Sequence, residues 1–176
     1  TEVKNRKNMS KVTLDIQRNS FKSLKAKCKA VEFNDPIRLQ KLGVALMNLL
    51  ARDKSYHTLS ANQCGLEEQI FVCRVNSTYT AYFNPTLIDI KRGELLHLVE
   101  GKETSQNFPT MSYTVRRPSE IRIGFQDYMG NKRMTWMYNL PARFWLIGYD
   151  YVNGLTPYDR QIDTTTKLEE EFQYNA

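Results

Sequence analysis

The sequence predicts an α+β fold in which antiparallel strands surround a helix close to the C-terminus. Two stretches repeat apolar residues at spacings of three and four, as amphipathic helices do. Several short runs alternate apolar with polar residues, as half-buried strands do. The strand runs follow one another and are not interleaved with helices, which favours segregated helices and antiparallel sheets. A chain of 176 residues is long enough for one such domain with its own core.

The first predicted helix begins at Pro36. Asp35 before it can cap the free backbone N–H groups, and proline suits the first helical position. The apolar face consists of leucines spaced by three and four residues: Leu39, Leu42, Leu46 and Leu49. The helix should end before residues 53–55.

Three short strands are predicted next, at residues 69–75, 79–84 and 87–91, with Asn84 and Pro85 separating the last two. Residues 92–118 show no clear period and are expected to be irregular. A hairpin joins 120–126 to 134–138 across Met129-Gly130-Asn131. The second helix opens at Pro141, runs to about residue 152 and ends at Asn153-Gly154, a normal helix stop.

The net charge of +6 is concentrated at the N-terminus. Residues 1–30 hold nine of the 25 basic residues and two of the 19 acidic ones, so the rest of the chain is nearly neutral. We therefore expect a basic N-terminal arm (1–30, with one strand at 12–16), a folded domain (31–160) and an acidic C-terminal tail (161–176). The arm has little aromatic interleaving, so nucleic acid is an unlikely partner and other protein subunits are the expected one.

Several classes of protein are disfavoured by composition. No apolar run approaches the roughly 18 residues of a membrane span, and the polar N-terminus does not read as a signal peptide. Three cysteines without a Cys-x-x-Cys pair do not predict a disulfide framework or a zinc knuckle. The two histidines, His57 and His97, limit any imidazole-based site.

Three blocks along the chain carry the functional signal: residues 59–65 (LSANQCG), 103–109 (ETSQNFP) and 147–154 (IGYDYVNG). In that order they resemble the peptide deformylases, whose blocks read G-x-G-L-A-A-x-Q, E-G-C-L-S-x-P and H-E-x-D-H-L-x-G. The resemblance extends over residues 28–160 and implies the deformylase fold. By position Glu103, Arg117, Arg143 and Asp150 resemble the family's charged scaffold residues, and we expect Glu103 and Arg143 to form a shielded ion pair.

The same resemblance implies a Cys/His/His metal hydrolase, and this chain departs from it at the chemical positions. Ser105 stands at the metal-binding cysteine, Ile147 and Tyr151 at the two histidines, and Gly148 at the catalytic glutamate. A hydroxyl and a phenol are poor ligands at neutral pH, and isoleucine and glycine offer neither a ligand nor a base. Gln63 is retained at the position that helps to hold the oxyanion. We therefore expect no catalytic residues, no metal ion and no cofactor.

The pocket is also expected to be partly filled. Tyr56 and Thr58 stand where the family has glycines, and Gln106 replaces a leucine. Ser105 as a nucleophile would need a base, and neither histidine lies in the matched helix. The simpler interpretations are a small polar filler at Ser105 and an exposed His57.

These observations favour a catalytically inactive pseudoenzyme with a structural role in complex assembly. The specific hypothesis is a baseplate hub subunit of a contractile phage tail, located in the virion; otherwise the protein is expected in the cytoplasm. Two alternatives stay open: a ribosome-associated binder of peptide or RNA, and a residual hydrolase with an altered site.

Overall fold

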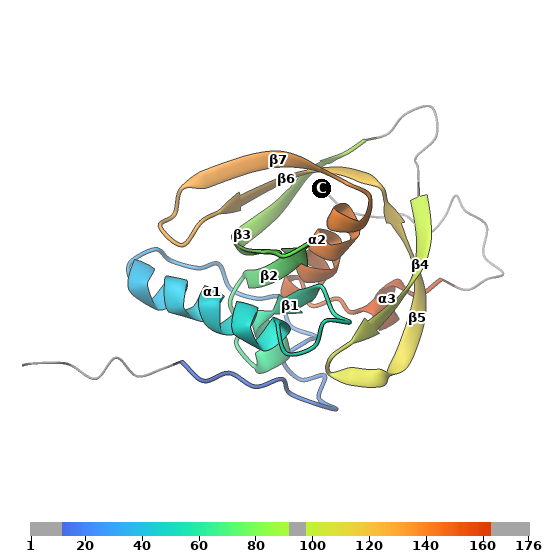
Figure 1. The fold of residues 1–176 in the computed structure, drawn as a ribbon, viewed down its shortest axis with the longest axis horizontal. Coiled ribbons are helices and arrows are strands. Elements are labelled where there is room, and N and C mark those ends of the chain that lie inside the picture. The colour runs from blue at the N-terminus through green and yellow to red at the C-terminus, as the bar shows by residue number, and fades with distance from the viewer. Residues whose placement is uncertain (1–11, 92–97, 163–176) are drawn as a thin grey trace, which may run out of the picture.

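The computed structural model describes residues 12–91 and 98–162 and confirms an α+β fold (Figure 1). The elements in chain order are α1 (Pro36–Leu50), β1 (Thr58–Ser60), the short 3₁₀ helix η1 (Ala61–Cys64), β2 (Ile70–Val75), β3 (Thr78–Ile90), β4 (Leu98–Ser105), β5 (Phe108–Pro118), β6 (Glu120–Gln126), β7 (Lys132–Tyr138), α2 (Asn139–Val152) and α3 (Pro157–Arg160).

Two antiparallel sheets enclose helix α2. The larger has five strands in the order β1-β2-β3-β6-β7, and β4 and β5 pair separately. Helix α2 contacts both, with β2 on one side and β5 on the other. Figure 1 shows it between the two sheets, while α1 lies along the five-stranded sheet. This arrangement places the third sequence block, on α2, against the other two.

Helix α1 begins where the sequence predicts. The Asp35 carboxylate accepts a hydrogen bond of 3.0 Å from the Arg38 backbone N–H, and Pro36 occupies the first turn. The predicted leucine face is buried against β1, β2 and β3. The capped N-terminus of α1 and its apolar face together set the direction in which the chain leaves α1 toward β1.

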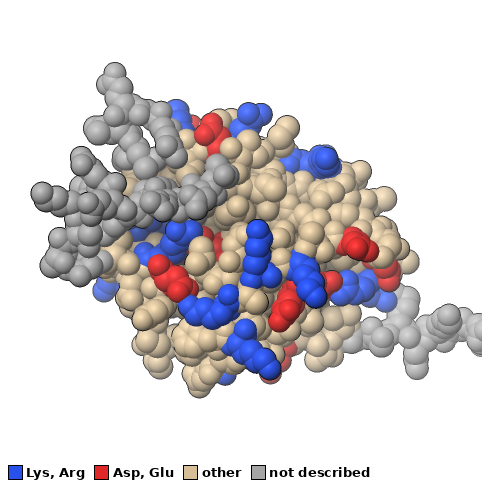
Figure 2. Space-filling view, turned by 180° about the vertical axis from the view of Figure 1, so that it is seen from behind, with Lys and Arg blue, Asp and Glu red and all other residues tan. Residues whose placement is uncertain are grey.

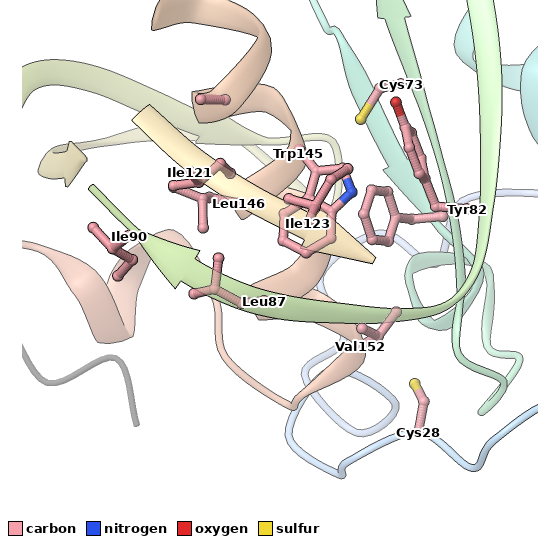
Figure 3. Close-up of a cluster of buried hydrophobic side chains, with 12 residues drawn as sticks. Cys28, Cys73, Tyr82, Leu87, Ile90, Ile121, Ile123, Trp145, Leu146 and Val152 are labelled. Carbon is pink, nitrogen blue, oxygen red and sulfur yellow. The ribbon is translucent and has the colours of Figure 1, made fainter. Parts of the chain in front are cut away.

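Strand β2 is buried on both faces, which divides the core in two. Ile70 and Val72 face α1, whereas Phe71 and Cys73 face α2. On the α2 side Trp145 is completely buried in the core shown in Figure 3. The Trp145 ring lies edge-on to that of Phe71, with 5.7 Å between the ring centroids. Since β2 alternates between two cores, its register is strongly specified.

Two predictions for the strands are wrong. Residues 78–90 form one long strand, β3, because Asn84 adopts a left-handed φ of 45° and the register with β6 shifts around it, so the strand bends without ending. Residues 98–118 are not irregular, since they form the β4–β5 hairpin, and residues 92–97 of the predicted irregular stretch lie outside the described residues. The predicted hairpin of β6 and β7 and the predicted helix α2 are confirmed.

The described part of the basic arm, residues 12–30, packs against the body and does not project from it (Figure 1). Gln17 donates a backbone hydrogen bond of 2.9 Å to the Gln63 carbonyl, and Cys28 donates one of 2.9 Å to the Val152 carbonyl. Leu24 is fully buried. The strand expected at 12–16 is not formed, although its alternating apolar residues are half-buried on the α1 core. Residues 1–11, and the tail from 163, lie outside the described residues.

The back face carries interspersed basic and acidic side chains and not one continuous basic surface (Figure 2). Within residues 12–91 and 98–162, no helix is both long and apolar enough to cross a membrane.

Candidate functional site

The three sequence blocks meet at a cleft between β1, β4 and α2. A cavity of about 140 Å³ opens there, walled by residues 55–58, by β4 and by the side chains of Arg143, Phe144 and Ile147 on α2. Ligand pockets usually measure roughly 300–1,000 Å³. The space is therefore suited to one end group or side chain and not to an extended ligand.

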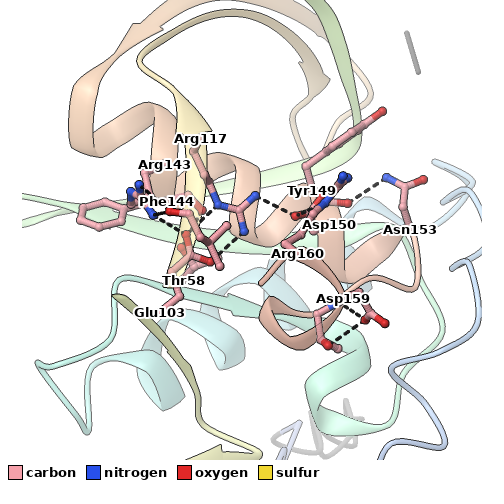
Figure 4. Close-up of polar contacts among 12 residues, drawn as sticks. Thr58, Glu103, Arg117, Arg143, Phe144, Tyr149, Asp150, Asn153, Asp159 and Arg160 are labelled. Atoms are coloured by element: carbon pink, nitrogen blue, oxygen red, sulfur yellow. Dashed lines mark hydrogen bonds and ion pairs between the residues drawn. The ribbon is translucent and has the colours of Figure 1, made fainter. Parts of the chain in front are cut away.

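A buried ion network forms the rigid wall of this cleft (Figure 4). Arg117 makes two bonds to Glu103, of 2.7 and 2.8 Å, and one of 2.7 Å to Asp150. Arg143 Nη1 lies 2.6 Å from Glu103 Oε1, so the predicted pair of Glu103 and Arg143 is confirmed. At the other end of the network, Arg160 Nη2 lies 3.0 Å from Asp150 Oδ1. The network ties β4, β5 and α2 together.

Behind the cavity lies a chain of buried carboxamides. Gln63 Oε1 accepts a bond of 3.0 Å from the Ser60 N–H, and Gln63 Nε2 donates to Gln106 Oε1 at 2.8 Å and to Asn107 Oδ1 at 2.9 Å. Gln106 Nε2 donates in turn to the Thr58 carbonyl at 2.7 Å. Gln106 thus crosses the cleft from the β4–β5 turn to β1.

Ser105 and Tyr151 lie in the interior, beyond the cavity. The Ser105 hydroxyl accepts a bond of 3.2 Å from the Asn107 N–H. The Tyr151 residue is 1% exposed, and its phenol oxygen has no hydrogen-bond partner within usual geometry among the described residues. Burial raises the pKa of Tyr151 far above its ordinary value, opposed in part by Ser105, so the phenol stays neutral.

Ile147 and Gly148 adjoin one another on α2 but face different surroundings. Ile147 lines the cavity. At Gly148 an added Cβ would lie 2.3 Å from the Phe71 ring, so this side chain of β2 occupies the space beside Gly148. A longer side chain at 148 would have to displace Phe71.

The residues at the family's metal positions do not fit a divalent cation. A neutral buried phenol, a serine hydroxyl already bonded to a backbone amide, and a hydrocarbon side chain are a poor donor set. Among the residues that the structure describes, no group of three or more His, Cys, Asp or Glu side chains could hold a metal ion.

The sequence predicted an exposed His57, but the structure places it at the cavity. It is half-buried, lines the cavity and stacks on Phe144 with ring centroids 4.1 Å apart. Its Nδ1 lies 3.3 Å from the Arg74 carbonyl. Donation from Nδ1–H to that carbonyl leaves Nε2 with a lone pair.

Sequence reasoning missed Arg117 as the centre of the ion network and Gln106 as a bridge. The alternation of buried Glu103 and Ser105 with exposed Lys102 and Thr104 in β4 carried part of this signal. The bond from Gln106 to Thr58 joins residues 48 positions apart, and only the fold reveals it.

A family model described as polypeptide deformylase matches residues 13–167. Similar curated proteins include peptide deformylase 1B, chloroplastic/mitochondrial, of Arabidopsis thaliana (30% identical, covering 77% of this chain and 54% of that protein) and peptide deformylase of Thermotoga neapolitana (24% identical, 73% and 83%). The chain spans about half the length of the plant relatives it matches.

The solved structures that resemble this chain include peptide deformylases as well. Peptide deformylase from Thermotoga maritima has a TM-score of 0.78 at 21% identity, covering 86% of this chain and 99% of that one. The Arabidopsis thaliana peptide deformylase 1B complex with an inhibitor has a TM-score of 0.76 at 26% identity, covering 85% and 82%. The deformylase-like fold expected from the sequence is confirmed.

These findings correct the functional prediction. The matched family is enzymatic, and the proteins named above are all peptide deformylases, which contradicts the expected pseudoenzyme and structural baseplate subunit, along with its virion location. Nothing in the comparisons supports the ribosome-associated binder either. One physical reason for the error is the arm: its described part is bound to its own domain, so its charge was poor evidence for a role in assembly.

Proposed function

Because the chain belongs to the peptide deformylase family, we propose that it acts on the formylated N-terminal end of a peptide in the cleft between β1, β4 and α2. The family supplies the substrate class. The observation that carries the proposal to this chain is the buried Gln63 carboxamide behind the cleft, whose N–H groups donate to the side-chain oxygens of Gln106 and Asn107.

Gln63 is suited to holding an amide oxygen. Its own oxygen accepts the Ser60 N–H, so the NH₂ side faces Gln106, the residue that separates it from the cavity, and η1 and β1 hold it there. A fixed, buried N–H donor stabilises negative charge that develops on a carbonyl oxygen during hydrolysis. The adjoining cavity then receives the first residue of the peptide.

In the proposed reaction, water adds to the formyl carbon, the C–N bond breaks, formate leaves, and the freed amine takes a proton. Among the described cavity residues, His57 is the one imidazole that can accept the proton from water and return it to the amine. Its stack on Phe144 fixes the ring. No step uses a metal ion, since Ser105, Ile147 and Tyr151 do not form a suitable donor set.

The test is formate release from an N-formyl-Met peptide, with the N-acetyl peptide as the matched control. The assay is run with EDTA and with added Fe²⁺, Ni²⁺ or Zn²⁺. We expect release that persists in EDTA and falls about 100-fold in His57→Gln. No release above the uncatalysed rate in any of these conditions would overturn the proposal.

Two earlier expectations remain proposals: contact with other protein subunits through the terminal segments, and a cytoplasmic location. The native mass of the full chain in an extract of its source tests the first. A complex well above the 20.6 kDa of one chain supports it, and a monomer rejects it.

A further inference from the structure

We infer that the Gln106 side chain occupies the amide-binding site of the cleft as an internal ligand, which any external amide must displace. Gln106 accepts from Gln63 Nε2 at 2.8 Å and donates to the Thr58 carbonyl at 2.7 Å. An uncharged amide needs one donor for its oxygen and one acceptor for its N–H. The Gln106 carboxamide has both partners and is buried.

The direction of each amide is fixed by backbone groups of known polarity. The Ser60 N–H can only donate, so Gln63 presents its NH₂ to Gln106. The Thr58 carbonyl can only accept, so Gln106 presents its NH₂ to β1 and its oxygen to Gln63. Reversing either amide would place two donors or two acceptors face to face. The site therefore recognises an amide in one orientation.

Gln106 also separates the cavity from the interior. The cavity is lined by Gln106 and Thr58, but Gln63 does not reach it. Beyond Gln106 lies Gln63, itself completely buried. Moving the Gln106 side chain aside would extend the cavity to the Gln63 N–H groups.

The turn that carries Gln106 is held by the N-terminal segment. Asn19 donates a backbone bond of 2.9 Å to the Asn107 carbonyl, and Asn107 Nδ2 donates to the Gln17 carbonyl at 2.6 Å. Phe21 stacks on Phe108 at 4.0 Å. Residues 17–21 thus stabilise the position in which Gln106 separates the cavity from Gln63. Detaching residues 17–21 from the β4–β5 turn would favour movement of Gln106 and a deeper cleft.

The experiment uses thermal unfolding of the full chain with acetamide as the probe. Gln106→Ala removes the internal amide and leaves space, so we expect its Tm to fall by about 5 °C and to be restored by acetamide at tens of millimolar. Gln106→Leu fills the space without an amide and should lose stability with no recovery. Gln126→Ala is the matched control, because the Gln126 carboxamide also accepts (from Asn84, 3.1 Å) and donates (to Gly130, 3.1 Å) but lies outside the cleft.

Recovery confined to Gln106→Ala supports the inference. Equal acetamide effects in all variants, or none in Gln106→Ala, would overturn it; circular dichroism checks that each variant is folded. The peptide substrate itself rests on the proposed function and is tested separately by binding of N-formyl-Met peptide to Gln106→Ala. Acetamide recovery without formyl-peptide binding would reject the peptide function and leave the internal amide site standing.

Discussion

Replacing Arg117 by methionine should cost about 3 kcal/mol of folding free energy. Arg117, Glu103 and Asp150 have side chains only 1–2% exposed, and Arg117 contacts both carboxylates. Removing one partner of a buried ion pair costs about 3–5 kcal/mol, because the remaining charge is left poorly solvated. The lower figure applies since Arg143 stays on Glu103 and Arg160 on Asp150.

Urea unfolding measures this loss directly. Arg116→Met is the matched control on the same strand, since its pair with Glu100 is longer, at 3.4 Å, and Glu100 is 53% exposed; we expect a loss below about 1 kcal/mol. A loss from Arg117→Met no larger than that from Arg116→Met would refute the reasoning.

Three further predictions follow from local geometry. Burial raises the pKa of the Cys73 thiol to about 12, so iodoacetamide at pH 8 should label it only after unfolding; rapid labelling of the native protein would contradict this. Gly148→Ala should cost about 1–3 kcal/mol in urea unfolding, because its Cβ would meet the Phe71 ring, and an unchanged midpoint would show that the ring moves freely. Burial raises the pKa of Asp159, but hydrogen bonds, first from Lys25, outweigh it and hold that pKa below its ordinary value. The stability from Asp159 should therefore be complete above the unfolded pKa and lost as pH falls through the folded one, and Asp159→Asn should show a smaller acid loss than wild type.

The elements that sequence predicted well have strong local signals. Asp35, Pro36 and the leucine period define α1, and Asn153-Gly154 ends α2, where Gly154 takes a φ of 79° that favours glycine. β4 escaped prediction because six of its eight residues are at most half-buried and polar residues occur at both phases of its alternation. β3 was split because proline and asparagine usually end a strand, whereas here a shift in register absorbs them.

The site was predicted as a set of positions and not as a set of contacts. Ile147 lines the cavity, and Gln63, Ser105 and Tyr151 are buried behind it, because the three blocks are brought together by α2 packing on β1 and β5. The bond from Gln106 to Thr58 depends on two side chains meeting across that cleft, and periodicity carries no information about it. Likewise, the charge count marked residues 1–30 but could not reveal that residues 12–30 pack on the domain itself.

Formate release tests most directly whether this cleft acts on formylated peptides. Wild type and Gln106→Ala are compared at pH 7 with an N-formyl-Met peptide in EDTA. We expect release by both proteins, about tenfold faster in the variant, because one internal hydrogen-bonded amide no longer competes for Gln63. Absence of formate above the uncatalysed rate from both proteins, each folded by circular dichroism, would contradict the claim.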